Sequence, residues 1–293
     1  MKILSLVSLL LLLASFCGCE DSSTYPSIFD EISQANPVVV KASQSKKNDI
    51  EDAFDFSKLQ NRNQVAFLPN TEVPFSGFAK RLYGNEQVEL LIEIKQGYVF
   101  SVKQWMQNGI LRADFKVIPG SLSIDNIPFE INVENASDFE ELFLSLPLRL
   151  TGKAKFWYDN GQVALEGSFA AGRAQGELKI LHPNSQVAFA ANMIEGQGDG
   201  LVEMWYENGQ RRSSAHFKNG QRSGLLESWN PNGVKLIKSN YSDDNPDGQA
   251  VFRYDSGGIK KQAVYRNGTL EGLVKEFYED GTKKSENNFL DGL

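Results

Sequence analysis

The sequence predicts an all-β fold in which tandem 24-residue β-hairpin repeats form one elongated, twisted antiparallel sheet, with a short α/β insertion. The first observation is a glycine that recurs every 24 residues. The second is a further glycine nine residues later, and the third is the alternation of apolar and charged residues between them. A fixed period of about 20–50 residues is typical of repeat proteins, whose units bury their apolar faces by stacking. The leading glycines are Gly152, Gly176, Gly200, Gly224, Gly248 and Gly272.

Asn-Gly pairs predict a hairpin turn in the middle of a unit. In the unit that begins at Gly200, a strand-like run ends at Tyr206, and Asn208-Gly209 follows. Asn-Gly favours a type I′ turn because both central residues there need a positive φ. A second pair, Asn219-Gly220, ends the return strand, so each unit is a hairpin plus the turn to the next. The structural turn glycines are Gly161, Gly209, Gly233, Gly257 and Gly281, with Ser185 in the second unit.

Alternation along the strands assigns two faces to the sheet. The second, fourth and sixth residues after each leading glycine are mostly apolar, as in Val202, Met204 and Tyr206, and the residues between them are charged or bulky. This pattern is typical of a half-solvated antiparallel sheet. The return strand ends in an aromatic residue or Met, such as Phe217, with a small residue such as Ala215 two positions earlier. We expect the small residue to leave room for a large side chain on a neighbouring strand.

The pattern G-x-x-x-x-W-Y-x-N-G, followed by F-x-x-G-x-x-x-G, resembles the MORN repeat, particularly its bacterial variant. The resemblance covers Gly152–Leu293 with six units in register. It implies a stack of hairpins and a role in binding or scaffolding, and many bacterial members carry an antitoxin label. The sequence departs from the pattern at His182–Ser185, which replaces an aromatic-turn block, and at Asp243–Asp247, which replaces an Asn-Gly turn.

The residues upstream of the six repeats, which occupy 151–293, divide into two predicted segments. Residues 71–120 contain degenerate repeats, because Trp105–Gly109 matches the turn block and Gly120 follows at the expected distance. Residues 121–150 break the pattern and form the predicted insertion. We expect a strand or hairpin over Ile124–Val133 and a short helix that begins at the capping box Ser137–Glu140.

The N-terminus predicts export and a lipid anchor. The apolar run Ile3–Leu13 is too short to span a bilayer and suits a signal peptide. Residues 1–19 end in a lipobox-like sequence, so we predict lipidation at Cys19 and an exported, membrane-anchored lipoprotein of the bacterial cell envelope. An ordinary signal peptide or an uncleaved anchor is the alternative. Residues 20–70 are polar and predict a flexible tether, with a short helix near Ile50–Leu59.

Composition argues against two classes of partner. The net charge of −7 disfavours nucleic acid, which requires a basic surface, and also disfavours a sheet that lies flat on anionic lipid. We therefore expect no nucleic-acid partner and membrane contact only through the N-terminal lipid. Both cysteines, Cys17 and Cys19, lie in the export segment, so the body of the protein has none for an internal disulfide.

No motif in the chain predicts chemistry, and we expect no catalytic residues, no cofactor and no metal site. His182 stands where other units have Tyr, and we interpret it as an aromatic substitute. Gly196–Gly200 lies between two hairpins without a following helix, which favours a turn over a nucleotide loop. Asp243–Asp247 offers clustered oxygens but lacks the ligand spacing of a calcium loop, so a solvated turn is favoured.

A bulky residue five positions after the leading glycine gives the candidate binding surface: Trp157, Trp205, Trp229 and Phe277. On adjacent repeats such rings would lie about 10 Å apart and could hold a sugar or a protein. The alternative, which repeat-identical aromatics favour, is that each ring packs on its neighbouring hairpin. We predict a non-enzymatic, membrane-tethered binding or scaffold protein with a protein partner. The alternatives are an antitoxin or immunity-type protein and a binder of cell-wall polysaccharide, and an enzyme ranks last.

Overall fold

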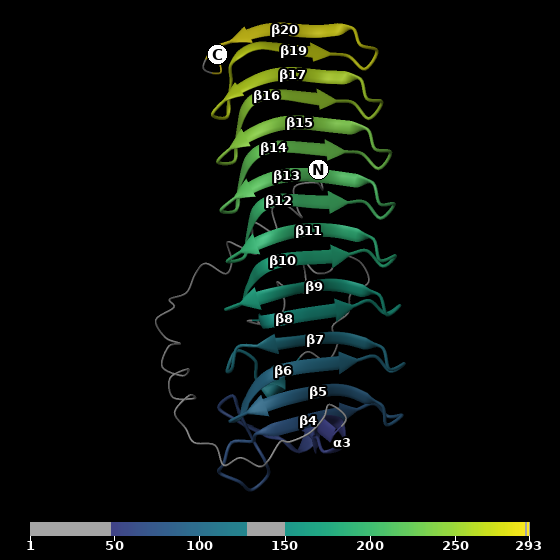
Figure 1. Cartoon of the computed structure of the whole chain (residues 1–293), viewed down its shortest axis with the longest axis vertical. Coiled ribbons are helices and arrows are strands. Elements are labelled where there is room, and N and C mark those ends of the chain that lie inside the picture. The colour runs from purple at the N-terminus through teal and green to yellow at the C-terminus, as the bar shows by residue number, and fades with distance from the viewer. Residues whose placement is uncertain (1–47, 128–149, 291, 293) are drawn as a thin grey trace.

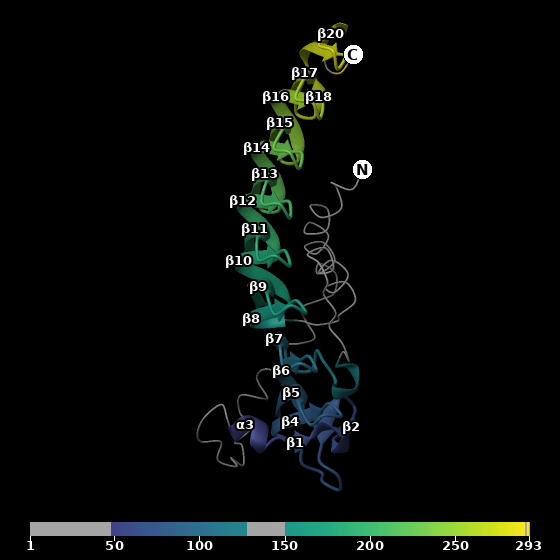
Figure 2. The ribbon, with the colours of Figure 1, turned by 90° about the vertical axis from the view of Figure 1, so that its right-hand side faces the viewer.

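The computed structural model describes residues 48–127, 150–290 and 292. All their strands except the β2–β3 pair form one 18-stranded sheet, which confirms the predicted all-β fold of repeated hairpins. Figure 1 shows the strands stacked along the long axis from β4 to β20, and Figure 2 shows the same stack edge-on as a thin layer. The strands after β1 (Phe54–Asp55) are β4 (Gly77–Leu82), β5 (Val88–Lys95), β6 (Tyr98–Trp105), β7 (Leu111–Val117), β8 (Leu150–Trp157), β9 (Val163–Ala170), β10 (Arg173–Leu181), β11 (Val187–Ile194), β12 (Gln197–Trp205), β13 (Arg211–Lys218), β14 (Gln221–Trp229), β15 (Lys235–Ser242), β16 (Asn245–Arg253), β17 (Ile259–Arg266), β18 (Thr269–Leu270), β19 (Gly272–Phe277) and β20 (Lys283–Phe289).

From β4 onward, strands that follow one another in sequence pair antiparallel, except that β18 and β19 both pair with β17. The leading glycine of each unit lies opposite the large residue that ends the return strand, as Gly200 does opposite Phe217. These glycines have positive φ, for example 87° at Gly200. A residue with a Cβ would be strained there, which explains why the 24-residue glycine register recurs.

The two turns of each unit differ, and the type I′ prediction is wrong for the first of them. Only Gly209 has a positive φ in the loop after Tyr206, and Asn208 does not. The Gly209 N–H donates to the Tyr206 carbonyl at 2.9 Å, and the Tyr206 N–H donates to Gln210 at 2.9 Å. This is a type I turn followed by a glycine bulge, which closes a three-residue loop. The second turn is type I′ as predicted, with φ of 51° at Asn219 and 78° at Gly220.

The alternation of faces is confirmed, and we call the two surfaces the inner face and the outer face. The inner face carries Ala154, Phe156 and Tyr158, which are all at most 3% exposed. One apolar cluster on this face extends from Ala66 to Met204. The small residue of the return strand gives room as expected at Gly167, where an added Cβ would lie 2.7 Å from the Leu178 side chain. The core is therefore one side of a single sheet.

The segment 48–75 differs from the expected flexible tether of residues 20–70. It contains α3 (Asn48–Glu51), β1, the 3-10 turn η1 (Phe56–Lys58), and the hairpin of β2 (Gln60–Arg62) and β3 (Val65–Phe67). Ala53 and Ala66 are buried, and partly buried Phe56, Leu59 and Phe75 pack on the core cluster. These few apolar residues suffice because the sheet supplies the rest of the apolar surface. Residues 20–47 lie outside the described residues.

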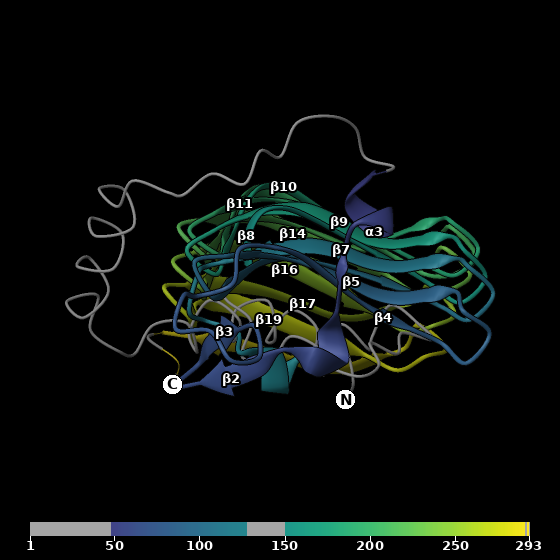
Figure 3. The ribbon, with the colours of Figure 1, turned by 90° about the horizontal axis from the view of Figure 1, so that it is seen from below.

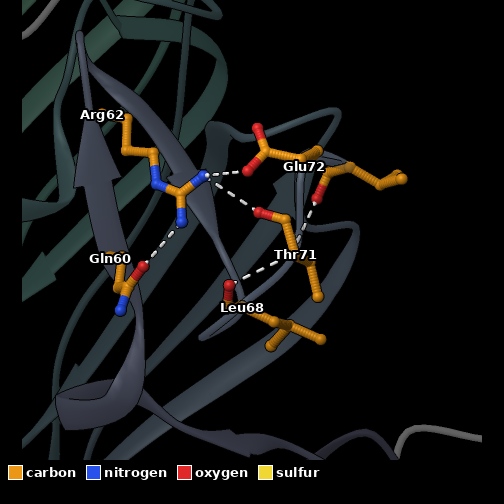
Figure 4. Close-up of polar contacts among 6 residues, drawn as sticks. Gln60, Arg62, Leu68, Thr71 and Glu72 are labelled. Atoms are coloured by element: carbon orange, nitrogen blue, oxygen red, sulfur yellow. Dashed lines mark hydrogen bonds and ion pairs between the residues drawn. The ribbon is translucent and has the colours of Figure 1, made fainter.

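Polar contacts fix this covering segment. Arg62 donates to the Thr71 carbonyl at 3.0 Å and to Gln60 at 2.9 Å, and it lies 3.5 Å from Glu72 (Figure 4). Figure 3 shows the strands of the main sheet arched, with β2 and β3 below the arch. The inner face is therefore the concave side, and α3 lies on the opposite side in Figure 2.

The described part of the predicted insertion also covers the inner face. Leu122, Ile124 and Ile127 are buried in the core cluster. Ile124–Asn126 form a 3-10 turn, η2, with Ser123 as its N-cap, where we expected the start of a strand. The Ser123 hydroxyl accepts from the Asp125 N–H, which favours the turn over an extended chain. The expected helix after Ser137 lies outside the described residues.

Candidate binding surfaces

The residue before each first turn joins one repeat to the next on the inner face. The Tyr206 hydroxyl donates to the carbonyl of Trp229, 23 residues later, at 2.9 Å. Tyr158 donates in the same way to Leu181 at 2.5 Å, and Tyr254 to Phe277 at 2.8 Å. His182 Nε2 lies 3.1 Å from the Trp205 carbonyl, which confirms that this histidine substitutes for a tyrosine. We call this series the tyrosine ladder.

The turn asparagine has two simultaneous roles. Asn208 accepts from the Gln210 N–H at 3.0 Å through its side-chain oxygen, which stabilises its own turn. Its side-chain nitrogen donates to the Pro231 carbonyl in the next repeat at 2.8 Å. Asn160 and Asn184 repeat this arrangement with Pro183 and Glu207. The aromatic and Asn positions of the repeat therefore hold neighbouring hairpins in register.

The other end of the hairpins, where the type I′ turns lie, has its own series of contacts between repeats. The N–H of the second residue in each type I′ turn donates to a carbonyl in the preceding unit, as Gly220 does to Gly198 at 3.0 Å. Asp243 and Asp244 form one of these turns with φ of 48° and 67°, and the Asp244 N–H donates to Arg222 at 3.1 Å. The acidic sequence is thus a turn, as expected.

The candidate binding residues Trp157, Trp205, Trp229 and Phe277 all lie in one column of the outer face and are half-buried. Basic side chains lie over two of the rings: Lys155 is 5.8 Å from the Trp157 centroid, and Lys235 and Arg211 are 5.3 and 5.7 Å from that of Trp229. The same lysines pair with carboxylates, Lys155 with Glu166 at 3.2 Å and Lys235 with Glu227 at 2.6 Å. The column is a mixed aromatic and charged surface.

The inner face changes character along the stack. The fourth residue after the leading glycine is Phe156, Ile180 and Met204 in the first three units, and it becomes Ser228, Phe252 and Glu276 in the last three. Met204 is 3% exposed, whereas Phe252 is half-buried and Tyr278 is 53% exposed. A shallow hollow lies on the last hairpins, lined by Phe252, Tyr254, Lys260, Lys261, Glu276, Phe277 and Lys284.

The titratable groups with shifted pKa values are exposed and bonded locally. The Thr282 hydroxyl and N–H lower the pKa of Asp280, and Ser57 does the same for Asp55. A hydrogen bond to Glu177 raises the pKa of Lys179. No group of three or more His, Cys, Asp or Glu suited to a metal ion is found within residues 48–127 and 150–290. In the same part of the chain, no helix is both long and apolar enough to cross a membrane. Cys19 lies outside the described residues.

The structure thus consists of regular hairpins whose constant 24-residue spacing comes from turn geometry and from hydrogen bonds between repeats. Three of the hairpins match the MORN repeat variant. The matched residues are 150–171, 198–219 and 270–291, which are β8–β9, β12–β13 and β18–β20. MORN-variant repeats indicate a repeat-based binding or scaffold role, and the unmatched hairpins between them, β10–β11, β14–β15 and β16–β17, share the same turns and pairings.

No curated protein matches this chain. Among solved structures, the crystal structure of TcdB2-TccC3-TEV is similar with 8% identity and a TM-score of 0.19, and it covers 73% of this chain. The crystal structure of TcdB2-TccC3 has 9% identity, a TM-score of 0.16 and 76% coverage. This chain spans only 13% and 14% of those chains.

Proposed function

We propose that this chain is a non-enzymatic, membrane-tethered binding protein of the bacterial cell envelope that holds a partner protein along its MORN-variant hairpins. The observation that carries the proposal is the stack itself. Hydrogen bonds at both ends of the hairpins fix neighbouring repeats, while the outer face and the last hairpins of the inner face carry half-buried aromatic side chains beside charged ones. A surface fixed before binding loses less conformational entropy when a partner docks.

The tether in this proposal rests on the sequence of the first 19 residues. A lipid on Cys19 would anchor the chain, and residues 20–47 would link it to the covered end of the stack. Because one acyl chain binds membranes only marginally, the multiple acyl chains of a lipoprotein suit a stable anchor.

Lipidation is tested by metabolic labelling with an alkyne analogue of palmitate. We expect label on the wild type and on Cys17→Ser, and no label on Cys19→Ser. Cys17 is the matched control because it lies two residues away in the same export segment. Label that persists in Cys19→Ser, or a wild type without label, would show that the anchor is assigned wrongly.

Partner capture is tested by affinity purification of the full chain from solubilised envelope, with identification by mass spectrometry. We expect one protein at near-equal stoichiometry, and its loss in the triple variant Trp157→Ala, Trp205→Ala, Trp229→Ala. Trp105→Ala is the matched control, since Trp105 ends β6 as Trp205 ends β12, outside the six repeats. Circular dichroism and thermal unfolding check that the triple variant folds.

The outcomes of this purification separate the possible roles. A toxin as the captured protein would identify an immunity role, and any other single protein a scaffold role. Retention on cell-wall glycan without a protein would contradict the proposal and favour a polysaccharide binder. Unfolding of the triple variant would show that the outer-face rings are structural. The protein captured by the wild type would then be the only result that distinguishes the possible roles.

A further inference from the structure

The inner face already packs against other segments of the chain at one end of the stack. Residues 53–75 and 118–127 of the chain lie over the first hairpins, where Phe56, Leu59 and Phe75 pack on the core cluster. The Ala66 N–H donates to the Gly97 carbonyl at 2.8 Å, so backbone contacts contribute as well. This face therefore accepts polypeptide segments that carry apolar side chains.

The inner-face positions recur every 24 residues as far as β20, and among the described residues no other segment covers them at that end of the stack. In β16–β20 the half-buried Phe252 and Tyr254 line the hollow, and Tyr254 is fixed by its hydrogen bond to the Phe277 carbonyl at 2.8 Å. Upstream, the residues equivalent to Phe252 and Tyr254 are Phe156 and Tyr158, which are 1% and 2% exposed. The inner-face surface that is buried at the first hairpins is therefore partly accessible to solvent at the last hairpins.

Charge indicates what this open surface would bind. Three lysines, Lys260, Lys261 and Lys284, line the hollow, and Glu276 is its one carboxylate. Glu276 lies 3.6 Å from Lys284. Lys260 and Lys261 lie over the rings of Tyr254 and Tyr265 at 5.5 and 6.0 Å, and no described carboxylate is within ion-pair distance of either. The hollow is therefore basic in a chain whose net charge is −7.

We propose that the inner face of β16–β20 binds an extended acidic segment of a partner protein, with carboxylates at Lys260 and Lys261 and an apolar side chain between Phe252 and Tyr254. The proposal rests on the binding function proposed above and adds to the outer-face tryptophans a second contact surface, together with the chemistry of the partner segment that it would hold. Charge pairing beside aromatic rings in a partly desolvated hollow strengthens such contacts. Nucleic acid is the poorer occupant because the three lysines of the hollow form too short a basic surface to neutralise a run of phosphates.

The test is fluorescence anisotropy of the detergent-solubilised full chain with a fluorescein-labelled peptide, Glu-Glu-Tyr-Glu-Glu-Tyr-Glu-Glu. We expect binding that weakens as salt rises and at least a tenfold loss of affinity in Lys260→Glu with Lys261→Glu. The matched control is Lys238→Glu with Lys275→Glu, which makes the same charge change on the outer face of β15 and β19. If the reversal variant does not fold, Lys260→Gln with Lys261→Gln removes the two charges without adding carboxylates.

Three results would overturn this inference: no binding of the acidic peptide, equal binding of a peptide with Lys in place of Glu, or equal loss of affinity in the outer-face control. The proposed function fails separately. If the wild type captures a partner from envelope but does not bind the acidic peptide, only the assignment of this surface is wrong. If it binds the peptide but captures no envelope protein, only the scaffold role is wrong.

Discussion

The tyrosine before each first turn illustrates how one residue serves both folding and repetition. Its ring belongs to the apolar inner face, as at Tyr158, which is 2% exposed. Its hydroxyl donates to a backbone carbonyl of the next repeat, as Tyr158 does to Leu181. An apolar ring with a polar tip suits both roles, so Tyr recurs at this position in the six repeats, with His182 and Asn230 as its two replacements.

Tyr206→Phe isolates the hydroxyl. We expect the free energy of unfolding to fall by about 1 kcal/mol, because the Trp229 carbonyl loses its donor while the ring stays in place. Urea denaturation followed by tryptophan fluorescence measures the change. Tyr278→Phe is the control, since Tyr278 lies in the last hairpin and is 53% exposed. A loss of similar size in both variants would show that the ladder contributes nothing specific.

Each hairpin uses two turn types because its two ends have different tasks. The glycine-bulge turn exposes an Asn whose side chain reaches the next repeat, as Asn208 reaches Pro231. The type I′ turn gives its N–H to the preceding repeat instead. Ser185 takes the glycine position of one bulge turn with φ 68°, and its hydroxyl donates to Gln162 at 2.5 Å. Ser185 is the only residue other than glycine at this position in the six bulge turns of residues 151–293, and it alone there adds a side-chain hydrogen bond to the previous repeat.

Gly281→Ala tests the backbone demand of the bulge turn. Gly281 has φ 85° and no atom within 4 Å of an added Cβ, so the substitution changes backbone strain alone. We expect a loss of about 1–2 kcal/mol in stability, measured by thermal unfolding. Gly84→Ala is the control, because its φ is not positive and its surroundings are equally open. Equal midpoints for both variants would contradict a left-handed requirement at Gly281.

The whole molecule is a stack whose two ends differ. The first hairpins bury their inner face under residues 53–75 and 118–127, and the buried apolar cluster ends at Met204. Beyond β14 the buried apolar residues are small, namely Ala250, Ala263 and Val274, and the larger inner-face side chains Phe252 and Tyr254 are half-buried. Because each hairpin contacts only its neighbours, local stability need not be uniform.

Hydrogen–deuterium exchange measured by mass spectrometry tests this gradient. We expect amides of β5–β12 to exchange at least tenfold more slowly than those of β16–β20, since apolar burial is greater there while hydrogen-bond pairing is alike. A peptide-by-peptide comparison of the paired strands gives the rates. Uniform exchange along the stack would show that the hydrogen-bond ladders, and not the inner-face core, determine local stability.

Much of this architecture is present in the sequence. The glycine period predicts the repeat, and the alternation at Val202, Met204 and Tyr206 predicts the inner face, because strand periodicity and positive φ are local properties. The Asn-Gly pairs predict turns but not their type, since the bulge at Gly209 depends on how the flanking strands pair. The hydrogen bond from Tyr206 to the next repeat has a trace in the sequence, because a hydroxyl-bearing residue recurs at an otherwise apolar inner-face position. The pattern within one strand does not show which atom that hydroxyl contacts.

By itself, then, the sequence determined the hairpin unit, its period and the side of each strand that is apolar, because these follow from the chemistry of a few adjacent residues. Only the tertiary structure decided which apolar surface is covered. Residues 48–75, polar enough to suggest a tether, pack on the first hairpins, while Lys260 and Lys261 come together with Phe252 and Tyr254 on the open end. Such contacts join distant segments, and their free energy depends on the surface the sheet supplies and not on local pattern.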